Sequence, residues 1–199
     1  RIEFFASRPS VADASNGEGE RYLGSVGVLT DGSGNINFNT TLANVWVNSG
    51  DRITATATVQ TAGPTYGSTS EFALNITATS TGIIVVDTVS DVADGTTTSI
   101  SALGAARGAD GRISLREAII AANNTANGGT PDKIVFAIPA ALAGGAHTIN
   151  VGAAGLPAIT QAVIVDASTE PDFAGTPMVE LNGSLATGSP GLYLGAGSS

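Results

Sequence analysis

The chain has 199 residues, enough for one large domain or two small ones. Asp and Glu outnumber Lys and Arg by 17 to 8, and the net charge of -9 argues against nucleic acid or an anionic membrane as a partner. The absence of Cys excludes disulfides, thiolate zinc sites and Cys nucleophiles, and no apolar stretch approaches the ~18 residues of a membrane span.

Residues 1–80 are predicted to form an all-β domain. Five strand patterns with turns between them lie at residues 1–7, 21–30, 35–42, 52–60 and 70–78. In the fourth pattern, apolar residues alternate with threonines, so the apolar side chains are expected to face the core and the threonines to face solvent. The apolar set is Ile53, Ala55, Ala57 and Val59, and the threonines are Thr54, Thr56 and Thr58. Such a series of short strands is typical of a sandwich or an open barrel.

Residues 81–199 are predicted to begin with a strand at 82–89, followed by one helix from Leu115 to about Asn124. An apolar stripe supports the helix and consists of Leu115, Ala118, Ile119 and Ala122. After it, short apolar strands recur at 133–138, 147–151, 162–167, 177–183 and 191–195, with centres about 14–16 residues apart. Regular short strands without helices between them favour a parallel β-solenoid, and the helix is expected to cover its end.

The stretch DGRISLREAII, which starts at Asp110, fits two interpretations. It matches the second half of a calcium-binding loop, but Ala106 and Gly108 occupy two positions that need carboxylate ligands. It also contains a capping box, in which Ser114 begins the helix and Glu117 follows three residues later. We interpret Ser114 and Glu117 as a structural helix cap and expect no cofactor. Calcium stays an alternative without a complete ligand set, because turn chemistry explains the Asp-Gly turns DGSGN and DGTTTS without a metal.

The sequence around this cap resembles the Cys-Ser-Leu-Arg-Glu-Ala (CSLREA) domain of large bacterial and archaeal surface proteins. The matching stretch is DGRISLREAIIAANN, in which Ile113 stands where the family has its Cys. The stretches DKIVFAI, HTI, LPAITQAVIVDAST, GTPMVELNGS and GLYL resemble the family's first coils in order. The resemblance implies that residues 81–199 form the helix-capped start of a right-handed parallel β-helix.

Residues 1–80 resemble the immunoglobulin-like β-sandwich repeats that flank such domains. The similar stretches are RIEFFAS, GEGERYLGSVGVLTDGSGNINF, ITATAT and STSEF. Two more strands usually precede RIEFF in that pattern, so the resemblance implies a sandwich that lacks its first strands. Such a sandwich has an open edge and an uncovered apolar face.

Together the two resemblances imply a non-catalytic, extracellular or cell-surface structural protein, part of a fibre, sheath or adhesin. We expect copies of the chain, or adjoining domains of a longer chain, to complete the sandwich and the solenoid by strand addition or coil stacking. The first residue is Arg1 rather than Met, which indicates a processed product or a fragment. Insertion into a membrane is not expected.

A carbohydrate-binding or carbohydrate-cleaving β-helix is one alternative, and a calcium-stiffened adhesin is another. Catalysis would need clustered carboxylates with a nearby cation, and the candidate carboxylates are Asp166, Glu170, Asp172 and Glu180. The last Lys or Arg in the chain is Lys133, so we interpret these acids as exposed strand and turn residues and expect no enzyme.

Two further side chains receive structural interpretations. His147, the only histidine, is expected at the surface or in a turn, because a single imidazole cannot hold a transition metal alone. Trp46, the only tryptophan, is expected to be partly buried in the sandwich, although an exposed aromatic side chain could stack on a sugar.

Overall fold

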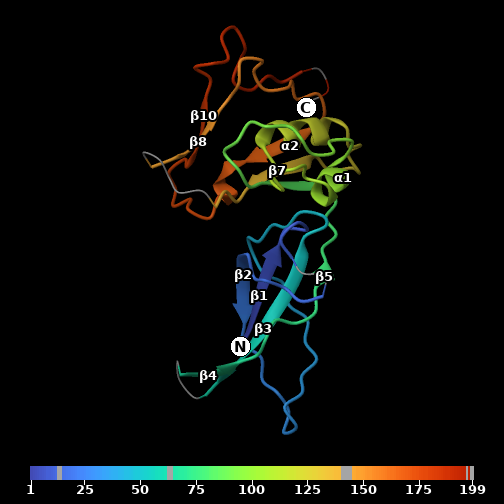
Figure 1. Cartoon of the computed structure of the whole chain (residues 1–199), viewed down its shortest axis with the longest axis vertical. Coiled ribbons are helices and arrows are strands. Elements are labelled where there is room, and N and C mark those ends of the chain that lie inside the picture. The colour runs from blue at the N-terminus through green and yellow to red at the C-terminus, as the bar shows by residue number, and fades with distance from the viewer. Residues whose placement is uncertain (13–14, 62–64, 140–144, 196, 198–199) are drawn as a thin grey trace. The chain divides into compact units, whose positions relative to one another are not determined.

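The computed structural model describes residues 1–12, 15–61, 65–139, 145–195 and 197 (Figure 1). The described part is mainly β and has both antiparallel and parallel sheets. The chain divides into two compact units, residues 1–45 with 50–78 and residues 46–49 with 79–199. The segment 46–49 therefore belongs to the second unit, whereas the sequence placed it in the first domain. No helix in these ranges is long and apolar enough to cross a membrane.

The first unit is built around an antiparallel sheet. Its strands are β1 (Ile2–Ser7), β2 (Arg21–Val26), β3 (Arg52–Gln60), β4 (Tyr66–Thr69) and β5 (Ile76–Thr77). The order is β2-β1-β3-β4, and β5 also pairs with β3, so β1 and β3 form the centre (Figure 1). Residues 35–42 form no strand, contrary to the prediction. The last predicted strand is reduced to β5 and a bridge from Leu74 to Asn16.

In β3 the threonine side of the strand is buried and the apolar side is more exposed, which is the reverse of the prediction. Thr54, Thr56 and Thr58 are buried, whereas the Val59 side chain is 58% exposed. The hydroxyls of Thr54 and Thr58 have partners: the Thr54 hydroxyl donates to the Ala73 carbonyl at 2.6 Å, and the hydroxyls of Thr58 and Thr69 lie 2.8 Å apart. Because these groups are hydrogen-bonded, the threonine face can be buried without the usual cost of unsatisfied polar atoms.

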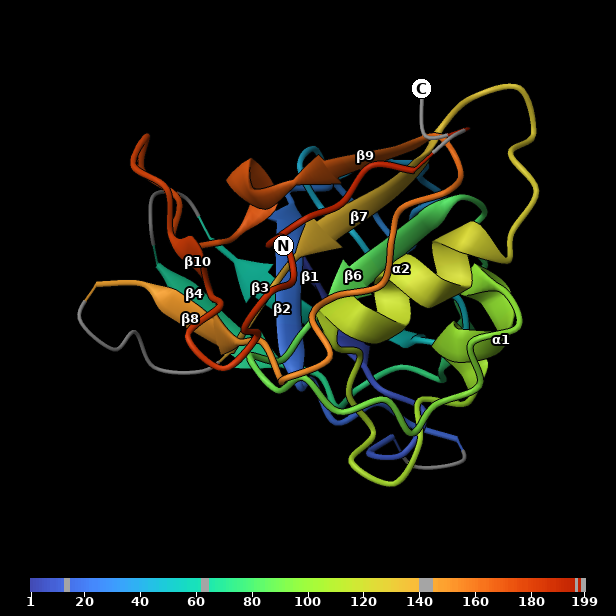
Figure 2. The same cartoon turned by 90° about the horizontal axis from the view of Figure 1, so that it is seen from above.

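Parallel pairs of strands build the second unit. One sheet has the order β6 (Ile83–Val86), β7 (Asp132–Phe136) and β9 (Val163–Asp166), and a second pairs β8 (His147–Asn150) with β10 (Val179–Asn182) (Figure 2). β7 pairs with β9 and β8 pairs with β10, so in both cases the partner is the next strand but one along the chain. Asn150 is opposite Asn182, 32 positions later, and the Asn182 side-chain amide donates to the Asn150 side-chain oxygen at 2.8 Å.

A third parallel contact repeats this pattern. The predicted strand at 191–195 is reduced to an isolated parallel bridge between Ile159 and Leu194. The predicted strand positions are thus close to β7, β8, β9 and β10, but the expected spacing of 14–16 residues separates strands of different sheets. The repeat that brings partners together is about twice as long.

Two short helices pack beside the sheet of β6, β7 and β9 (Figure 2). They are α1 (Ile100–Ala105), which the sequence did not predict, and α2 (Leu115–Asn123); a 3-10 turn, η1, spans Ala167–Thr169. All four residues of the predicted stripe on α2 are buried. They join a continuous core whose largest fully buried members include Ile84, Leu103, Ile113, Leu115, Ile119, Ile134, Phe136 and Ile149.

Side chains of the segment 46–49 form hydrogen bonds and packing contacts with the same unit. The Asn48 side chain donates to the Val85 carbonyl at 3.1 Å and accepts the Val85 amide at 2.7 Å. The Lys133 ammonium lies 5.4 Å from the centre of the Trp46 ring, at a cation–π distance. Trp46 is partly buried, as predicted, but it packs with Val85, Val135 and Ala137 of the second unit rather than inside the first.

Candidate functional site

The capping box predicted at Ser114 and Glu117 is present at the start of α2. The Ser114 hydroxyl accepts the Glu117 amide at 3.2 Å, and the Glu117 carboxylate accepts the Ser114 amide at 2.9 Å. The Ser114 hydroxyl also donates to the Val92 carbonyl at 2.6 Å. The cap therefore ties the helix to the loop that precedes α1 as well as closing the helix end.

Glu117 does more than a cap requires. Its second carboxylate oxygen accepts the amides of Asp94 at 2.9 Å and Gly95 at 2.7 Å. The side chain is almost fully buried, and its oxygens receive three backbone amides in all. The three amide donors satisfy the hydrogen-bonding capacity of this buried carboxylate, which joins the start of α2 to the loop at Asp94 and Gly95.

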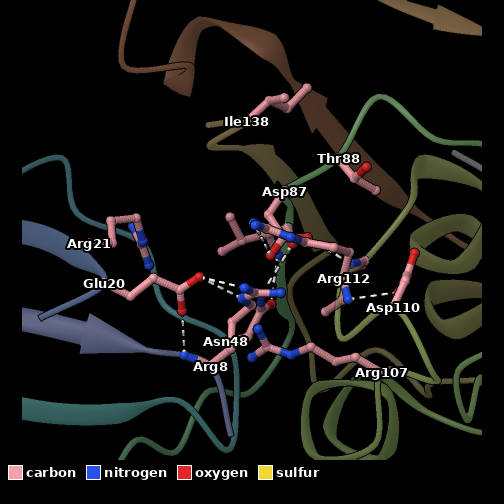
Figure 3. Close-up of polar contacts among 12 residues, drawn as sticks. Arg8, Glu20, Arg21, Asn48, Asp87, Thr88, Arg107, Asp110, Arg112 and Ile138 are labelled. Atoms are coloured by element: carbon pink, nitrogen blue, oxygen red, sulfur yellow. Dashed lines mark hydrogen bonds and ion pairs between the residues drawn. The ribbon is translucent and has the colours of Figure 1, made fainter. Parts of the chain in front are cut away.

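The acidic side chains around the Asp110 loop, where calcium was the alternative interpretation, accept hydrogen bonds from backbone amides. Asp94 accepts the Ala109 amide at 2.7 Å. Asp110 accepts the Arg112 amide at 2.8 Å (Figure 3). Asp87 accepts the Ile113 amide at 2.6 Å and lies 3.7 Å from the Arg112 guanidinium. These contacts connect the acidic side chains of the loop to its backbone amides and to Arg112.

Arg116, the remaining polar residue of the Ser-Leu-Arg-Glu stretch, makes a two-point ion pair with Asp91. Its Nε and Nη2 atoms lie 3.0 and 2.6 Å from the two Asp91 oxygens, and Nη2 also donates to the Gly155 carbonyl at 2.7 Å. Asp91 in turn accepts the Gly152 amide at 2.8 Å. The polar side chains of the Ser-Leu-Arg-Glu stretch therefore connect α2 to loops before and after it in the chain.

The four candidate carboxylates have different surroundings. Asp166 caps η1 by accepting from the Ser168 amide and hydroxyl, and Glu180 accepts the Thr148 hydroxyl at 2.9 Å in an exposed contact. The Asp172 side chain is half exposed. Glu170 is buried, so the prediction that all four are exposed is wrong for this residue. Its side chain turns inward to accept the Ile138 amide at 3.0 Å.

His147 is buried at the start of β8, which makes the prediction of a surface or turn position wrong. Its Nε2 atom lies 3.6 Å from Glu170 Oε1 and 3.5 Å from Asp172 Oδ2. Neither ring nitrogen has a hydrogen-bond partner among the described residues. The three side chains place their ligand atoms within 4.8 Å of one another, an arrangement that could hold a metal ion.

Burial is the main influence on Glu170 and raises the pKa of its carboxyl above the ordinary value. The Ile138 amide and His147 act in the opposite direction, and Asp172 adds to the increase. All three residues were candidates in the sequence, but the sequence did not predict that they lie together. His147 and Glu170 are far apart along the chain. The only hint is that the single histidine is followed, one strand later, by the acidic pair in TEPD.

A separate hollow of about 530 Å³ in the second unit is lined mainly by serine and threonine residues. They are Ser49, Thr79, Ser80, Thr81, Ser99, Ser101, Thr125 and Thr130, and Asp132 lies among them. Asp132 Oδ2 is buried without a hydrogen-bond partner in the described part of the chain, and burial raises the pKa of this carboxyl. The lining residues include no Lys or Arg that could neutralise a bound acid or assist a lyase reaction.

In comparisons with known proteins, the chain matches no family model, no curated protein and no solved structure.

Proposed function

We propose that the chain is a non-catalytic structural segment of an extracellular surface protein, such as a fibre, sheath or adhesin. In this proposal the first unit is an immunoglobulin-like sandwich that is incomplete by itself. The second unit is the helix-capped start of a right-handed parallel β-helix of the CSLREA type. Copies of the chain, or adjoining domains of a longer chain, supply the missing contacts.

The strand pairing supports the β-helix part of the proposal. In a parallel β-helix each coil stacks on the one before it, so strands pair in parallel with the equivalent strand one coil later. The pairs β7–β9 and β8–β10 and the Ile159–Leu194 bridge follow such a pattern. The hydrogen bond between Asn150 and Asn182 adds a stacked pair of identical side chains, a contact that suits repeated coils.

The single observation that supports an assembly function best is an apolar face on the first unit. We use this name for Ile2, Leu29, Ile36, Phe38, Ala57 and Val59, which line a shallow hollow of about 920 Å³. Leu29 is 90% exposed and Val59 is 58% exposed. Contiguous apolar side chains at a surface usually mark an interaction site.

The open edges of the sheets agree with this role. β2 and β4 lie at the two ends of the strand order in the first unit, and each has one partner among the described strands. Their outer backbone groups can pair with an added strand. A binding pocket for a small substrate is not needed in such a function.

Self-association is the test of this proposal. Sedimentation velocity over a wide concentration range, with electron microscopy of the concentrated sample, should show oligomers or filaments. Val59→Lys should weaken self-association at least about tenfold, because it places a charge on the apolar face. Leu185→Lys changes a residue that is 62% exposed in the second unit and serves as the matched control. A chain that stays monomeric at every concentration would contradict self-assembly.

Carbohydrate binding is a second candidate, favoured by the hollow that serine and threonine residues line around Asp132. Hydroxyls and a carboxylate can hydrogen-bond to sugar hydroxyl groups. Titration calorimetry against a panel of oligosaccharides, with Thr130→Val as a variant in the hollow, tests this candidate. If Thr130→Val binds the sugar as the native chain does, the sugar binds outside this hollow. If the native chain binds none of the oligosaccharides, carbohydrate binding is wrong.

A further inference from the structure

We propose that His147, Glu170 and Asp172 form a binding site for a divalent transition-metal ion, with Zn²⁺ as the best fit. The ion would join the start of β8 to the turn that follows η1. The proposal goes beyond the assembly function and does not depend on it, because it concerns contacts inside the second unit alone.

The unpartnered histidine is the first argument. The His147 side chain is completely buried, and both of its ring nitrogens lack a hydrogen-bond partner among the described residues. A buried polar group without a partner costs about 1–3 kcal/mol, so native structures rarely contain one without a reason. Nε2 points at two carboxylate oxygens. A cation between these three atoms would be a partner for all of them.

The distances are the second argument. The gaps of 3.5 and 3.6 Å between His147 Nε2 and the carboxylate oxygens are too long for hydrogen bonds. A protonated histidine would draw the oxygens to about 2.7–2.9 Å. Two ligand atoms that each bind a tetrahedral zinc ion at about 2.1 Å lie about 3.4 Å from one another. The observed gaps therefore suit atoms that share a metal better than atoms that share a proton.

The chemistry of the ligands selects the class of ion. One imidazole nitrogen with two carboxylates is a mixed nitrogen and oxygen set, which suits Zn²⁺ and related ions, whereas Ca²⁺ and Mg²⁺ prefer oxygen ligands only. Two carboxylate charges balance the charge of a divalent ion, which removes the penalty for burying Glu170 as an anion. Water would complete the coordination.

The surroundings supply orientation and access. The Ile138 amide donates to Glu170 and fixes its carboxylate, as outer contacts commonly do for metal ligands. The Asp172 side chain is 54% exposed, so an ion can enter from that side and Asp172 can close over it. His147 and Glu170 thus form the buried part of the site, and Asp172 forms its open side.

Titration of the metal-free chain tests the proposal directly. The chain is prepared without a histidine tag, treated with chelator and titrated with Zn²⁺ by calorimetry, and its melting temperature is followed in parallel. We expect one ion per chain and a rise in melting temperature with Zn²⁺ concentration. Co²⁺ in place of Zn²⁺ should give visible absorption bands typical of a low-symmetry site.

Two variants and one control locate the ion. Asp172→Asn removes an exposed ligand with little risk to folding, and His147→Gln removes the nitrogen ligand; each should weaken Zn²⁺ binding at least about tenfold. Glu180→Gln changes an exposed carboxylate of the same unit outside the cluster and should bind as the native chain does. The proposal is overturned if the native chain binds neither Zn²⁺ nor Co²⁺, or if Asp172→Asn binds as tightly as the native chain.

Discussion

The Glu117 carboxylate accepts the backbone amide of Asp94 at 2.9 Å, although 23 residues separate the two along the chain. The same carboxylate accepts the amide of Ser114 at the beginning of α2. One side chain thus closes a helix and holds the loop that precedes it. A local capping signal has become a tertiary contact, and its loss should affect the whole second unit.

Glu117→Gln is expected to lower the free energy of unfolding by about 2–3 kcal/mol, because three charge-assisted contacts to buried amides are weakened. Ser114→Ala should cost about 1–2 kcal/mol, mainly through the lost cap. Urea titrations of the two variants and the double variant measure both effects. Glu180→Gln, an exposed carboxylate, is the control, and a Glu117→Gln variant as stable as this control would show that the contacts add nothing.

Arg116→Lys should lower the unfolding free energy by about 1–2 kcal/mol even though the charge is kept. The planar guanidinium contacts both Asp91 oxygens and the Gly155 carbonyl, whereas an ammonium cannot match that geometry. Arg112→Lys is a matched change, because Arg112 makes a longer ion pair of 3.7 Å with Asp87. Thermal melts that show equal losses for the two variants would contradict the importance of the two-point geometry.

Thr54→Val should destabilise the first unit by about 1–2 kcal/mol, because it removes the hydrogen bond to the Ala73 carbonyl inside a buried layer. Val59→Thr, the reverse exchange on the opposite face of β3, should change stability by less than about 0.5 kcal/mol. Chemical denaturation of both variants tests the orientation of the strand. The opposite ranking would mean that the apolar residues face the core.

Asp132→Asn should stabilise the chain near neutral pH by about 1 kcal/mol, because it removes a charge from a buried site with an unpartnered oxygen. Burial raises the pKa of Asp132 in the folded state, so the folded chain binds this proton more tightly than the unfolded chain. The destabilisation by the charged, buried Asp132 carboxylate is fully present above its raised pKa. It disappears as the pH falls below the ordinary pKa of 3.8. Melting curves of both proteins from pH 7 to pH 3 should therefore converge at the acidic end, and a constant difference would contradict the assignment.

Several features of this protein were predictable from the sequence because they depend on neighbouring residues. The capping box needs only Ser114 and Glu117, three positions apart, and the stripe on α2 needs only the helical period. The mainly β character also followed from short alternating runs. These signals are local, and the local structure obeys them.

Other features depend on residues that are distant in the sequence. Period-two alternation shows that β3 has two different faces, but it does not say which one becomes buried. That choice was made by partners such as Ala73 and Thr69, whose groups satisfy the threonine hydroxyls. In the same way, regular spacing located β7 to β10 but not the pairing of alternate strands, because any two strands of similar length can form a parallel ladder.

The sequence by itself determined where the helix cap lies, where most strands of the second unit fall and which classes of partner the charge disfavours. Only the tertiary structure decided that His147 is buried beside Glu170 and Asp172, that Trp46 belongs to the second unit and which residues form the exposed apolar face of the first. The physical reason is the range of the interactions. Capping and periodicity act within a few residues, whereas burial and the meeting of charged groups depend on which distant segments the fold brings together.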